Sequence, residues 1–432
     1  MKIAISGASG YIGRHLTTFF EGKGYEIVSL DRNLFKEEQF SLLCRRVAQC
    51  DVVLNLAGAP INKRWTNAYK QELYNSRIGV TRQLVRAINA NEIMPRLFIS
   101  ISAVGYYSSV GEYDEYNAEQ GDTFLARLCS DWEEAARTCS SGVRLVIARL
   151  GVVLSTDGGA LEQMLRMQRL SRMGVVIGSG KQGFPWISMA DLCRSFDFVI
   201  QEPHLQGVIN MVSPQCITQK HLAVVLAKAY GIRRILSFPS CFFRLLLGEG
   251  ASFLTEGQIV HPTKLLGFGF NYVYSTIEKM MHIADYQTIP KLDVSRYMGR
   301  WYEIARFENR FERGMTHVQA TYTLQSDGKI SVLNEGLKDG VLKKAHGKGK
   351  QSDPGNNPGK LKVAFFWRFY SDYYIFELDE NYQYALVGSS SDKYLWILSR
   401  SKELSDTVRE YLIGKIKERG FDTSKLLFTA QD

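Results

Sequence analysis

The stretch that decides the fold of the first half of the chain is Lys2-Ile-Ala-Ile-Ser-Gly7-Ala-Ser-Gly10-Tyr-Ile-Gly13-Arg-His-Leu16. It starts as an apolar run and turns through glycines spaced G-x-x-G-x-x-G before a helical pattern begins. Glycines let a backbone approach a pyrophosphate closely, and a helix N-terminus offers unpaired N–H donors at the positive end of its dipole. The stretch therefore predicts a first strand, a first helix and a dinucleotide-binding loop between them.

Short apolar runs recur along the first half of the chain, separated by segments of helix length. The runs lie at 25–30, 51–56, 97–101, 143–149 and 207–212, and the helical segments at 11–22, 66–90, 123–140 and 218–230. Strands that alternate with helices specify a parallel, doubly wound sheet with helices on both faces. We expect this α/β fold for the first half.

The length of the chain predicts more than one domain. Its 432 residues exceed the roughly 250–300 residues at which a single core usually stops growing. No run approaches the roughly 20 apolar residues of a membrane helix, and no signal-peptide pattern precedes the first glycine turn. We therefore expect a two-domain, cytoplasmic protein without a transmembrane segment.

Charges and cysteines narrow the classes of partner. The net charge of +9 comes from basic residues interspersed with acidic ones, without a nucleic-acid-binding motif. We expect general surface character, or peripheral contact with anionic ligands or a membrane surface, and no nucleic acid. The seven cysteines form no C-x-x-C pair and have no metal-ligand spacing to histidines, which predicts reduced, structural thiols and no metal site.

The second strand ends in Asp31-Arg32, where the adenosine ribose of a dinucleotide would lie. A carboxylate there accepts hydrogen bonds from a ribose 2′-hydroxyl, whereas an arginine favours a 2′-phosphate. The two residues therefore point to NAD and NADP respectively, and Asp31 can also turn away or pair with Arg32. The sequence slightly favours NADP over NAD.

These residues, with Asn55-Leu-Ala-Gly58, resemble the extended short-chain dehydrogenase/reductase superfamily. Further motifs resemble its divergent nucleotide-sugar-epimerase-like subgroup, within the NAD-dependent epimerase/dehydratase superfamily. They are Arg64-Trp65, Ser76-Arg77, Ser102-Ala-Val-Gly-Tyr-Tyr107, Trp132-Glu133, Arg149-Leu-Gly-Val-Val-Leu154, Gly158-Gly-Ala-Leu161, Pro185-Trp-Ile187 and Gly257-Gln-Ile-Val-His-Pro262.

The resemblance covers residues 1–283. It implies a Rossmann-like NAD(P)-binding domain at 1–285, with a small substrate-side subdomain built from segments at about 155–190 and 233–283. The cofactor-binding residues that it implies are Gly7, Ser9, Gly10, Tyr11, Ile12, Gly13, Asp31, Arg32, Leu56, Ala57, Gly58, Arg77, Ser102 and Arg149.

The catalytic residues of this superfamily are only partly present. Its members use a serine to orient the substrate, a tyrosine to transfer the proton and a lysine to lower the pKa of the tyrosine. Ser102 matches the serine, but the expected Tyr-x-x-x-Lys reads Phe124-Leu-Ala-Arg-Leu128. Tyr106 and Tyr107 are the nearest phenols, and they either replace the missing group or pack against the core.

The substrate side is expected around Gly178-Ser-Gly180-Lys-Gln182-Gly-Phe-Pro-Trp186, which is typical of a loop that closes over nicotinamide and substrate. Gln182 and Trp186 are the candidate substrate residues, and the other reading of Trp186 is a core anchor. Arg77 is a candidate for binding an anionic substrate group or a cofactor phosphate.

After residue 283 the helical patterns give way to short alternating runs. They lie at 318–324, 330–334, 361–366, 373–378, 384–388 and 394–398, with turn residues between them and a last helix at 402–419. Many short strands in one stretch predict an antiparallel barrel or sandwich. We expect a linker at 286–291 and an all-β domain at 292–432.

The segment Gly299-Arg-Trp301-Tyr-Glu-Ile-Ala305 resembles the G-x-W-Y signature of lipocalins, and Leu395-Trp-Ile-Leu-Ser-Arg400 resembles their terminal arginine motif. The whole of 290–432 resembles the bacterial, apolipoprotein-D-like lipocalins. This implies an eight-stranded barrel with a C-terminal helix, in which Gly299, Trp301 and Arg400 are chiefly structural and Trp301 closes one end.

The open end of such a barrel would hold a lipid or another hydrophobic ligand, because an eight-stranded barrel encloses room for one small molecule. The candidate lining residues are Phe365, Trp367, Tyr373 and Tyr384. Side chains alternate between the two faces of a strand, so only about half of these residues are expected to face inward.

Two functions follow from these resemblances. The first is an NAD(P)-dependent oxidoreductase or epimerase, acting on a small molecule, with the barrel holding a hydrophobic ligand. The second is a non-catalytic NAD(P)-binding protein that carries a hydrophobic ligand in its barrel. Loss of the tyrosine and lysine favours the second, whereas the glycine loop, Ser102 and the substrate-side segment favour the first. The sequence leaves an oligomer open.

Overall fold

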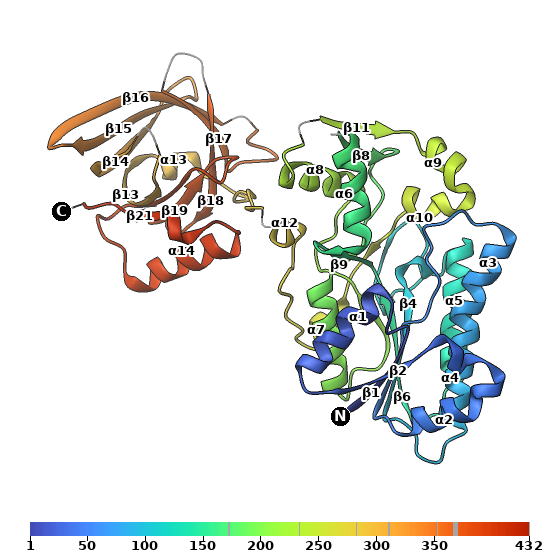
Figure 1. The fold of residues 1–432 in the computed structure, drawn as a ribbon. Coiled ribbons are helices and arrows are strands. Elements are labelled where there is room, and N and C mark those ends of the chain that lie inside the picture. Colours follow the sequence, from blue (N-terminus) through green and yellow to red (C-terminus); the bar gives the residue numbers. More distant parts are fainter. Residues whose placement is uncertain are drawn as a thin grey trace. The chain divides into compact units, whose positions relative to one another are not determined.

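The computed structural model describes residues 1–171, 173–232, 234–281, 283–309, 312–351, 353–365 and 370–431. The chain divides into two compact units, Met1–Met281 and His282–Asp432 (Figure 1). None of the helices in the described ranges has the length and hydropathy that crossing a membrane requires.

The first unit is organised by a six-stranded sheet in the order β10-β6-β4-β3-β1-β2, in which all neighbouring strands are parallel. The strands are β1 (Lys2–Ser6), β2 (Glu26–Leu30), β3 (Val52–Asn55), β4 (Leu97–Ala103), β6 (Arg144–Leu150) and β10 (Gly207–Met211). The strand order reverses beside β1, and doubly wound sheets bind their ligands at such a switch point.

Helices cover both faces of this sheet, as Figure 1 shows. Leu16 and Phe20 of α1 (Tyr11–Gly22) and Phe196 of α7 (Met189–Gln201) pack on one face. Leu43 of α2 (Phe40–Ala48) and Leu84 of α4 (Val80–Asn89) pack on the other, together with α5 (Phe124–Arg137). The predicted doubly wound α/β fold is confirmed.

The first unit has further helices and small sheets outside the six-stranded sheet. The helices are α3 (Asn67–Tyr74), α6 (Gly159–Ser171), α8 (Gln219–Ala229), α9 (Ser240–Leu247), α10 (Ser252–Thr255), α11 (Thr263–Gly267) and α12 (Ile277–Met280). Three small parallel sheets pair β11 (Arg234–Phe238) with β8 (Met173–Ile177), β12 (Ile259–Val260) with β5 (Glu112–Tyr113), and β7 (Val152–Ser155) with β9 (Trp186–Ser188).

The second unit is a closed antiparallel barrel of eight strands with a C-terminal helix, as predicted. The strands are β13 (Gly299–Phe307), β14 (Met315–Leu324), β15 (Ile330–Lys338), β16 (Val341–Gln351), β17 (Lys360–Ala364), β18 (Ser371–Leu378), β19 (Tyr384–Gly388) and β20 (Leu395–Ser399). The ring closes because β13 pairs with both β14 and β20. The short α13 (Val294–Tyr297) precedes the barrel, and β21 (Leu426–Phe428) adds to β13.

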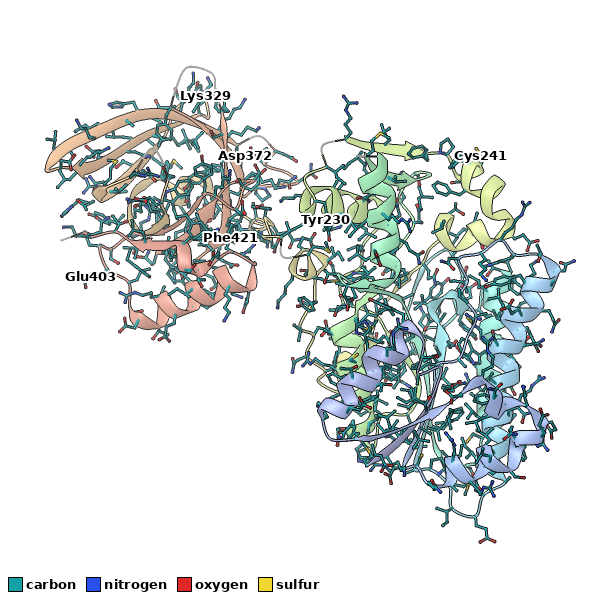
Figure 2. The ribbon with its side chains drawn as sticks, viewed as in Figure 1. Tyr230, Cys241, Lys329, Asp372, Glu403 and Phe421 are labelled. Carbon is teal, nitrogen blue, oxygen red and sulfur yellow. The ribbon has the colours of Figure 1, made fainter. Side chains whose placement is uncertain are left out.

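Alternation along the strands divides the apolar side chains of the barrel into two clusters. Ile375 and Val387 belong to the interior cluster with Trp301. Phe376 and Leu386, their neighbours in sequence, belong to the outer cluster beneath α14 (Asp406–Glu418). Phe421 follows that helix and packs against Phe376 with ring centroids 5.7 Å apart (Figure 2).

Candidate functional site

The glycine loop after β1 is shaped so that larger residues do not fit. Gly7 has a φ of +74°, and a Cβ on Gly13 would lie 2.2 Å from the carbonyl oxygen of Gly7. Gly10 is the N-cap residue of α1 and provides no side-chain cap. The first N–H groups of α1 are therefore available to an anion, and the cradle fits the pyrophosphate of a dinucleotide.

The other predicted cofactor residues near the loop lie at its rim. The hydroxyl of Tyr11 donates a hydrogen bond of 2.8 Å to Asp157, which brings the start of α6 beside the loop. Ser9 is exposed and Ile12 is partly buried. Leu56 follows β3, and its N–H donates to the hydroxyl of Ser6 at 3.2 Å. Ala57 continues this segment, so the ends of β1 and β3 adjoin.

Asp31 and Arg32 are both exposed at the end of β2. The carboxylate of Asp31 accepts a hydrogen bond of 3.2 Å from Ser29, and Asp31 is the N-cap residue of the short turn Arg32–Phe35. No ion pair joins Asp31 to Arg32 within the described ranges. In the described residues, the guanidinium of Arg32 is therefore not neutralised by the carboxylate of Asp31.

Arg77 is held by the protein itself. Its guanidinium donates to the carbonyl oxygens of Ala59 at 2.9 Å and Leu73 at 3.3 Å, and it lies over the ring of Trp132. Burial lowers the pKa of Arg77 below its ordinary value. A Cβ on Gly58 would lie 3.1 Å from this guanidinium, so Arg77 packs against the loop that follows β3 and supports it.

Ser102 and Arg149 meet at a carboxylate that the sequence did not single out as functional. The hydroxyl of Ser102 donates to Glu133 at 2.9 Å, and Arg149 donates to both oxygens of Glu133 at 2.7 and 2.9 Å. All three side chains are buried. Burial acts to lower the pKa of Arg149, but the bonds to Glu133 hold it above its ordinary value. Ser102 is therefore committed to this network.

The two candidate phenols differ in their surroundings. Tyr107 is buried, and its hydroxyl contacts Asn210 at 2.8 Å. Burial raises the pKa of Tyr107, against the opposing charge of Arg149, so this phenol stays protonated at neutral pH and belongs to the core. Tyr106 is partly exposed, and its ring lies 3.6 Å from the guanidinium carbon of Arg149.

A cavity of about 380 Å³ opens at Phe124, the position where the superfamily has its tyrosine. Its lining residues are Trp65, Thr123, Phe124, Gly248, Glu249, Ser252 and Glu256. Lys70 pairs with Glu249, and its ammonium lies 5.1 Å from the centre of the Phe124 ring. Leu128, the position of the missing lysine, is buried in the core. The ionisable lining residues of this cavity thus come from the segment 248–256, and Lys70 of α3 pairs with one of them.

The two predicted substrate residues lie elsewhere. Trp186 is fully buried in β9, so its side chain is a core anchor and has no surface for a substrate. Gln182 is partly buried, and its side-chain amide donates to the carbonyl oxygens of Ile177 and Leu254, each at 3.1 Å. Gln182 thereby ties its loop to the segment that lines the cavity.

Trp301 of β13 and Arg400, which follows β20, are in direct contact. The guanidinium carbon of Arg400 lies 3.9 Å from the centre of the Trp301 ring. Its N–H groups donate to several carbonyl oxygens, including Arg300 at 2.7 Å and Met298 at 2.8 Å. Gly299 has a φ of +94°, and a Cβ there would lie 3.2 Å from Arg400. The three residues therefore form one packed unit where β13 begins and β20 ends.

The predicted lining residues of the barrel divide between its faces. Tyr373 faces the interior, where its hydroxyl contacts those of Tyr297 at 2.7 Å and Tyr322 at 3.1 Å. Phe365 is 45% exposed and packs against Gly347. Tyr384 instead lies on the outer face, against Tyr411 of α14. Trp367 lies outside the described residues.

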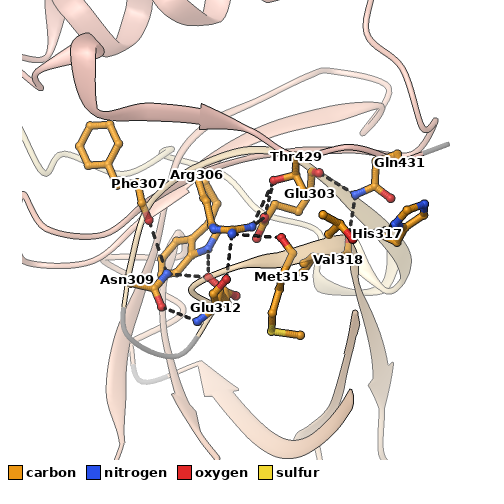
Figure 3. Close-up of polar contacts among 12 residues, drawn as sticks. Glu303, Arg306, Phe307, Asn309, Glu312, Met315, His317, Val318, Thr429 and Gln431 are labelled. Carbon is orange, nitrogen blue, oxygen red and sulfur yellow. Dashed lines mark hydrogen bonds and ion pairs between the residues drawn. The ribbon is translucent and has the colours of Figure 1, made fainter. Parts of the chain in front are cut away.

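A buried polar network inside the barrel was missed from the sequence (Figure 3). Arg306, fully buried, donates to Glu303 at 2.6 Å and to the carbonyl oxygen of Glu312 at 2.8 Å. The carboxylate of Glu312 accepts from Trp396 at 2.9 Å. Burial and the charge of Glu312 raise the pKa of Glu303 to about 7, against the opposing effect of Arg306. The C-terminal Thr429 donates to Glu303 at 2.7 Å.

Known families match both units. Residues 3–211 match the NAD dependent epimerase/dehydratase family, and residues 238–282 match a domain of unknown function. Residues 292–431 match the lipocalin-like domain family. The two resemblances noted from sequence motifs are therefore found along nearly the whole chain.

Relatives of known sequence match the first unit. The epimerase family protein SDR39U1 of Mus musculus is 36% identical over 282 residues, which span 63% of this chain and 96% of the mouse protein. The chloroplastic SDR39U1 homolog of Arabidopsis thaliana is 36% identical over 294 residues, which span 63% of this chain and 84% of the plant protein.

Solved structures also match the first unit. The human SDR39U1 (isoform 2) with NADPH aligns with a TM-score of 0.60 and 32% identity, covering 65% of this chain and 98% of the human chain. A nucleoside-diphosphate sugar epimerase from Corynebacterium glutamicum aligns with a TM-score of 0.52 and 27% identity, covering 65% of this chain and 58% of that chain.

Proposed function

The chain belongs to the SDR39U1 epimerase family and carries an added lipocalin-like domain, and from this membership we propose an NAD(P)-dependent oxidoreductase or epimerase that works with a barrel-bound hydrophobic ligand. The observation that carries the proposal is the cavity at Phe124, in the same unit as an intact dinucleotide cradle. Bound NAD(P) would supply the hydride chemistry.

The preferred cofactor in this proposal is NADP. Asp31 is engaged by Ser29, whereas the exposed Arg32 is not paired with Asp31 in the described residues. A guanidinium at this place favours a 2′-phosphate. The human relative was solved with NADPH, which supports the same choice.

In the proposed reaction, side chains that line the cavity transfer the proton. The hydroxyl of Ser102 already donates its hydrogen bond to the buried Glu133, and Phe124 has no ionisable proton. Glu249, which pairs with Lys70, and the partly buried Glu256 are the ionisable residues among those that line the cavity. A general acid or base must lie within hydrogen-bond reach of the substrate, and we infer that these carboxylates act on a molecule held against Trp65 and Phe124, which line the same cavity.

The barrel ligand in this proposal is apolar with one hydrogen-bond donor. Val332, Ile375 and Val387 provide an apolar interior. Asn334 pairs with Ala320 in the strand register, shares a face with Val332, and has a buried side-chain oxygen without a partner among the described residues. A lipid alcohol, or another hydrophobic molecule with an O–H or N–H group, matches this lining.

We also propose peripheral contact with an anionic membrane through the hairpin of β15 and β16. Val341 and Leu342, the first residues of β16 after the turn at Asp339 and Gly340, are each 54% exposed. The strand β16 contains four lysines and no acidic residue, and it is mostly exposed. Exposed apolar side chains on a strand rich in lysine match an anionic lipid surface. Co-sedimentation with phosphatidylglycerol vesicles should weaken in Leu342→Ser and not in Leu266→Ser, which changes an exposed leucine of the first unit.

A second candidate function is a non-catalytic carrier that binds NAD(P) and a hydrophobic molecule. The observation in its favour is the loss of both relay positions, Phe124 and Leu128, together with the engaged Ser102. Under this alternative the cavity at Phe124 binds a ligand without converting it.

Native mass spectrometry of the freshly purified full chain tests the proposal, followed by identification of the molecules released on denaturation. Retained NADP(H) with a hydrophobic molecule is the expected result. Oxidation of added NADPH in the presence of the released molecule would support the enzyme, and its absence would support the carrier. Failure of NADPH and NADH to bind at all would contradict both functions.

A further inference from the structure

Three segments of the first unit bring a thiol, an imidazole and a carboxylate together. Cys216 lies in the loop between β10 and α8, His261 follows β12, and Glu112 lies in β5. The sulfur of Cys216 is 3.6 Å from Nδ1 of His261, and Nε2 of His261 is 3.4 Å from Glu112. None of these residues belongs to the cofactor cradle or to the cavity at Phe124.

The backbone on both sides of this cluster is fixed. The N–H of His261 donates to Tyr113 at 2.9 Å, and its carbonyl oxygen accepts from the side chain of Asn210 at 3.0 Å. Ile217, next to Cys216, is buried, and its carbonyl oxygen accepts from Phe184 at 2.8 Å. These backbone hydrogen bonds hold the segments that carry the thiol and the imidazole in place.

The imidazole is oriented as a base for the thiol. When Nε2 donates its hydrogen to Glu112, Nδ1 is the unprotonated nitrogen and faces the sulfur. Burial and the charge of Glu112 raise the pKa of Cys216. The thiol thus keeps its proton near neutral pH, and its reactivity depends on a neighbour that takes the proton as the sulfur attacks.

The other cysteines lack this arrangement. Burial raises the pKa of Cys129 to about 11 and that of Cys193 to about 12, which is typical of inert core thiols. Cys241 is exposed on α9 (Figure 2), and no histidine or carboxylate contacts it among the described residues. Cys241 is therefore a built-in reference for an exposed thiol without a base.

We propose that Cys216, His261 and Glu112 form a thiol-modification site that takes small, uncharged or cationic disulfides. The sulfur of Cys216 attacks one sulfur of the disulfide, whose S–S bond breaks as the mixed disulfide forms. His261 takes the thiol proton at Nδ1 and passes it to the departing thiolate. Cys216 is oxidised and one half of the disulfide is reduced. The carboxylate of Glu112, 67% exposed, disfavours anionic disulfides.

A group attached to Cys216 would affect the loop 178–186, on the expected substrate side of the same unit. The carbonyl oxygen of Ile217 accepts a hydrogen bond from the N–H of Phe184, and the N–H of Gln219 donates to the carbonyl oxygen of Gln182 at 3.0 Å. Both partners belong to the loop 178–186, whose Gln182 reaches the segment lining the cavity. Modification of Cys216 is therefore placed to shift this loop.

The test is time-resolved labelling of the full chain with cystamine, with each cysteine quantified by peptide mass spectrometry. Cys216 should react about tenfold faster than Cys241. This rate ratio is smaller than the roughly 10²–10⁴-fold acceleration that a positioned general base typically contributes. His261→Gln should reduce the Cys216 rate to about that of Cys241, whereas the control His204→Gln should leave it unchanged. Equal rates at Cys216 and Cys241, or a Cys216 rate unaffected by His261→Gln, would overturn the proposal.

Glu112→Ala, which removes both the charge and the hydrogen-bond acceptor, separates a positioning role from a simple charge effect. Loss of the Glu112 charge alone would lower the pKa of Cys216 and speed its labelling, whereas loss of the hydrogen bond that orients His261 should slow it. We expect slower labelling, and faster labelling would overturn the role of Glu112. Unchanged labelling of Cys241 and continued protection of Cys193 report that each variant is folded. These readouts do not depend on cofactor binding, so they stand apart from the proposed function.

Discussion

The hydroxyl of Ser102 lies 2.9 Å from the carboxylate of Glu133 and donates its hydrogen bond to it. The carboxylate is buried and also binds the buried Arg149 through two hydrogen bonds. A serine that orients substrates in related enzymes is here part of an ion-pair network in the core.

Glu133→Gln should therefore act mainly on stability. Removing one charge of a buried pair typically costs about 3–5 kcal/mol, because the other charge is left uncompensated. Urea unfolding of the full chain measures this loss. The control Arg137→Gln removes the partly exposed partner of Glu133 and should cost about 1 kcal/mol or less. Equal small losses in both variants would contradict the assigned role of Glu133.

Glu303 gives the barrel a distinct pH dependence. Its pKa is raised from 4.5 to about 7 in the folded chain, so the folded state keeps this proton at pH values where the unfolded state has lost it. Its contribution to stability is therefore greatest at pH values below about 4.5 and falls as pH rises toward 7. The stability difference between wild type and Glu303→Gln should follow this window. A difference that is independent of pH would contradict the raised pKa.

The interior of the barrel should accept an apolar probe that carries a donor, such as N-phenyl-1-naphthylamine. Val387→Trp fills the interior and should abolish the fluorescence increase of the probe, whereas Val341→Trp, at an exposed position, should not. Overfilling a core typically costs about 1–3 kcal/mol, so Ala385→Leu provides a milder variant on the same strand. Binding that is equal in all three variants would place the probe outside the barrel.

Arg32 should set the choice between the two dinucleotides. Arg32→Ala should weaken NADPH by about tenfold, the value of one charge-assisted hydrogen bond, and leave NADH nearly unchanged. Asp31→Ala should instead weaken NADH. The exposed Arg82 of α4 is the matched control. Fluorescence titration of both nucleotides measures these changes, and an equal loss for NADPH and NADH in Arg32→Ala would contradict recognition of the 2′-phosphate.

Much of the fold could be predicted because its signals are local. The apolar runs and the glycine turn determine β1 and α1, and alternating side chains mark most barrel strands. The strand β16 was missed because its lysines and glycines show no apolar alternation. It forms because β15 pairs with it along nine residue pairs, from Ile330–Gly349 to Lys338–Val341.

The functional residues were harder to predict because their contacts are not local. Ser102 and Glu133 are 31 positions apart, and Cys216 and His261 are 45 positions apart. Nothing in the spacing of these residues indicates that they meet. The alternation rule allowed half of the barrel candidates to face inward, but only the register shows that Tyr373 does so and Tyr384 does not.

The most direct test of the account is the affinity of the full chain for NADPH in a matched pair of glycine variants on α1. A Cβ at Gly13 would lie 2.2 Å from the Gly7 carbonyl oxygen, whereas a Cβ at Gly22 would meet nothing within 4 Å. NADPH should bind to wild type and to Gly22→Ala with similar affinity, and binding should be lost in Gly13→Ala while its far-ultraviolet circular dichroism stays native. Unchanged binding in folded Gly13→Ala, or no binding to wild type, would contradict the account.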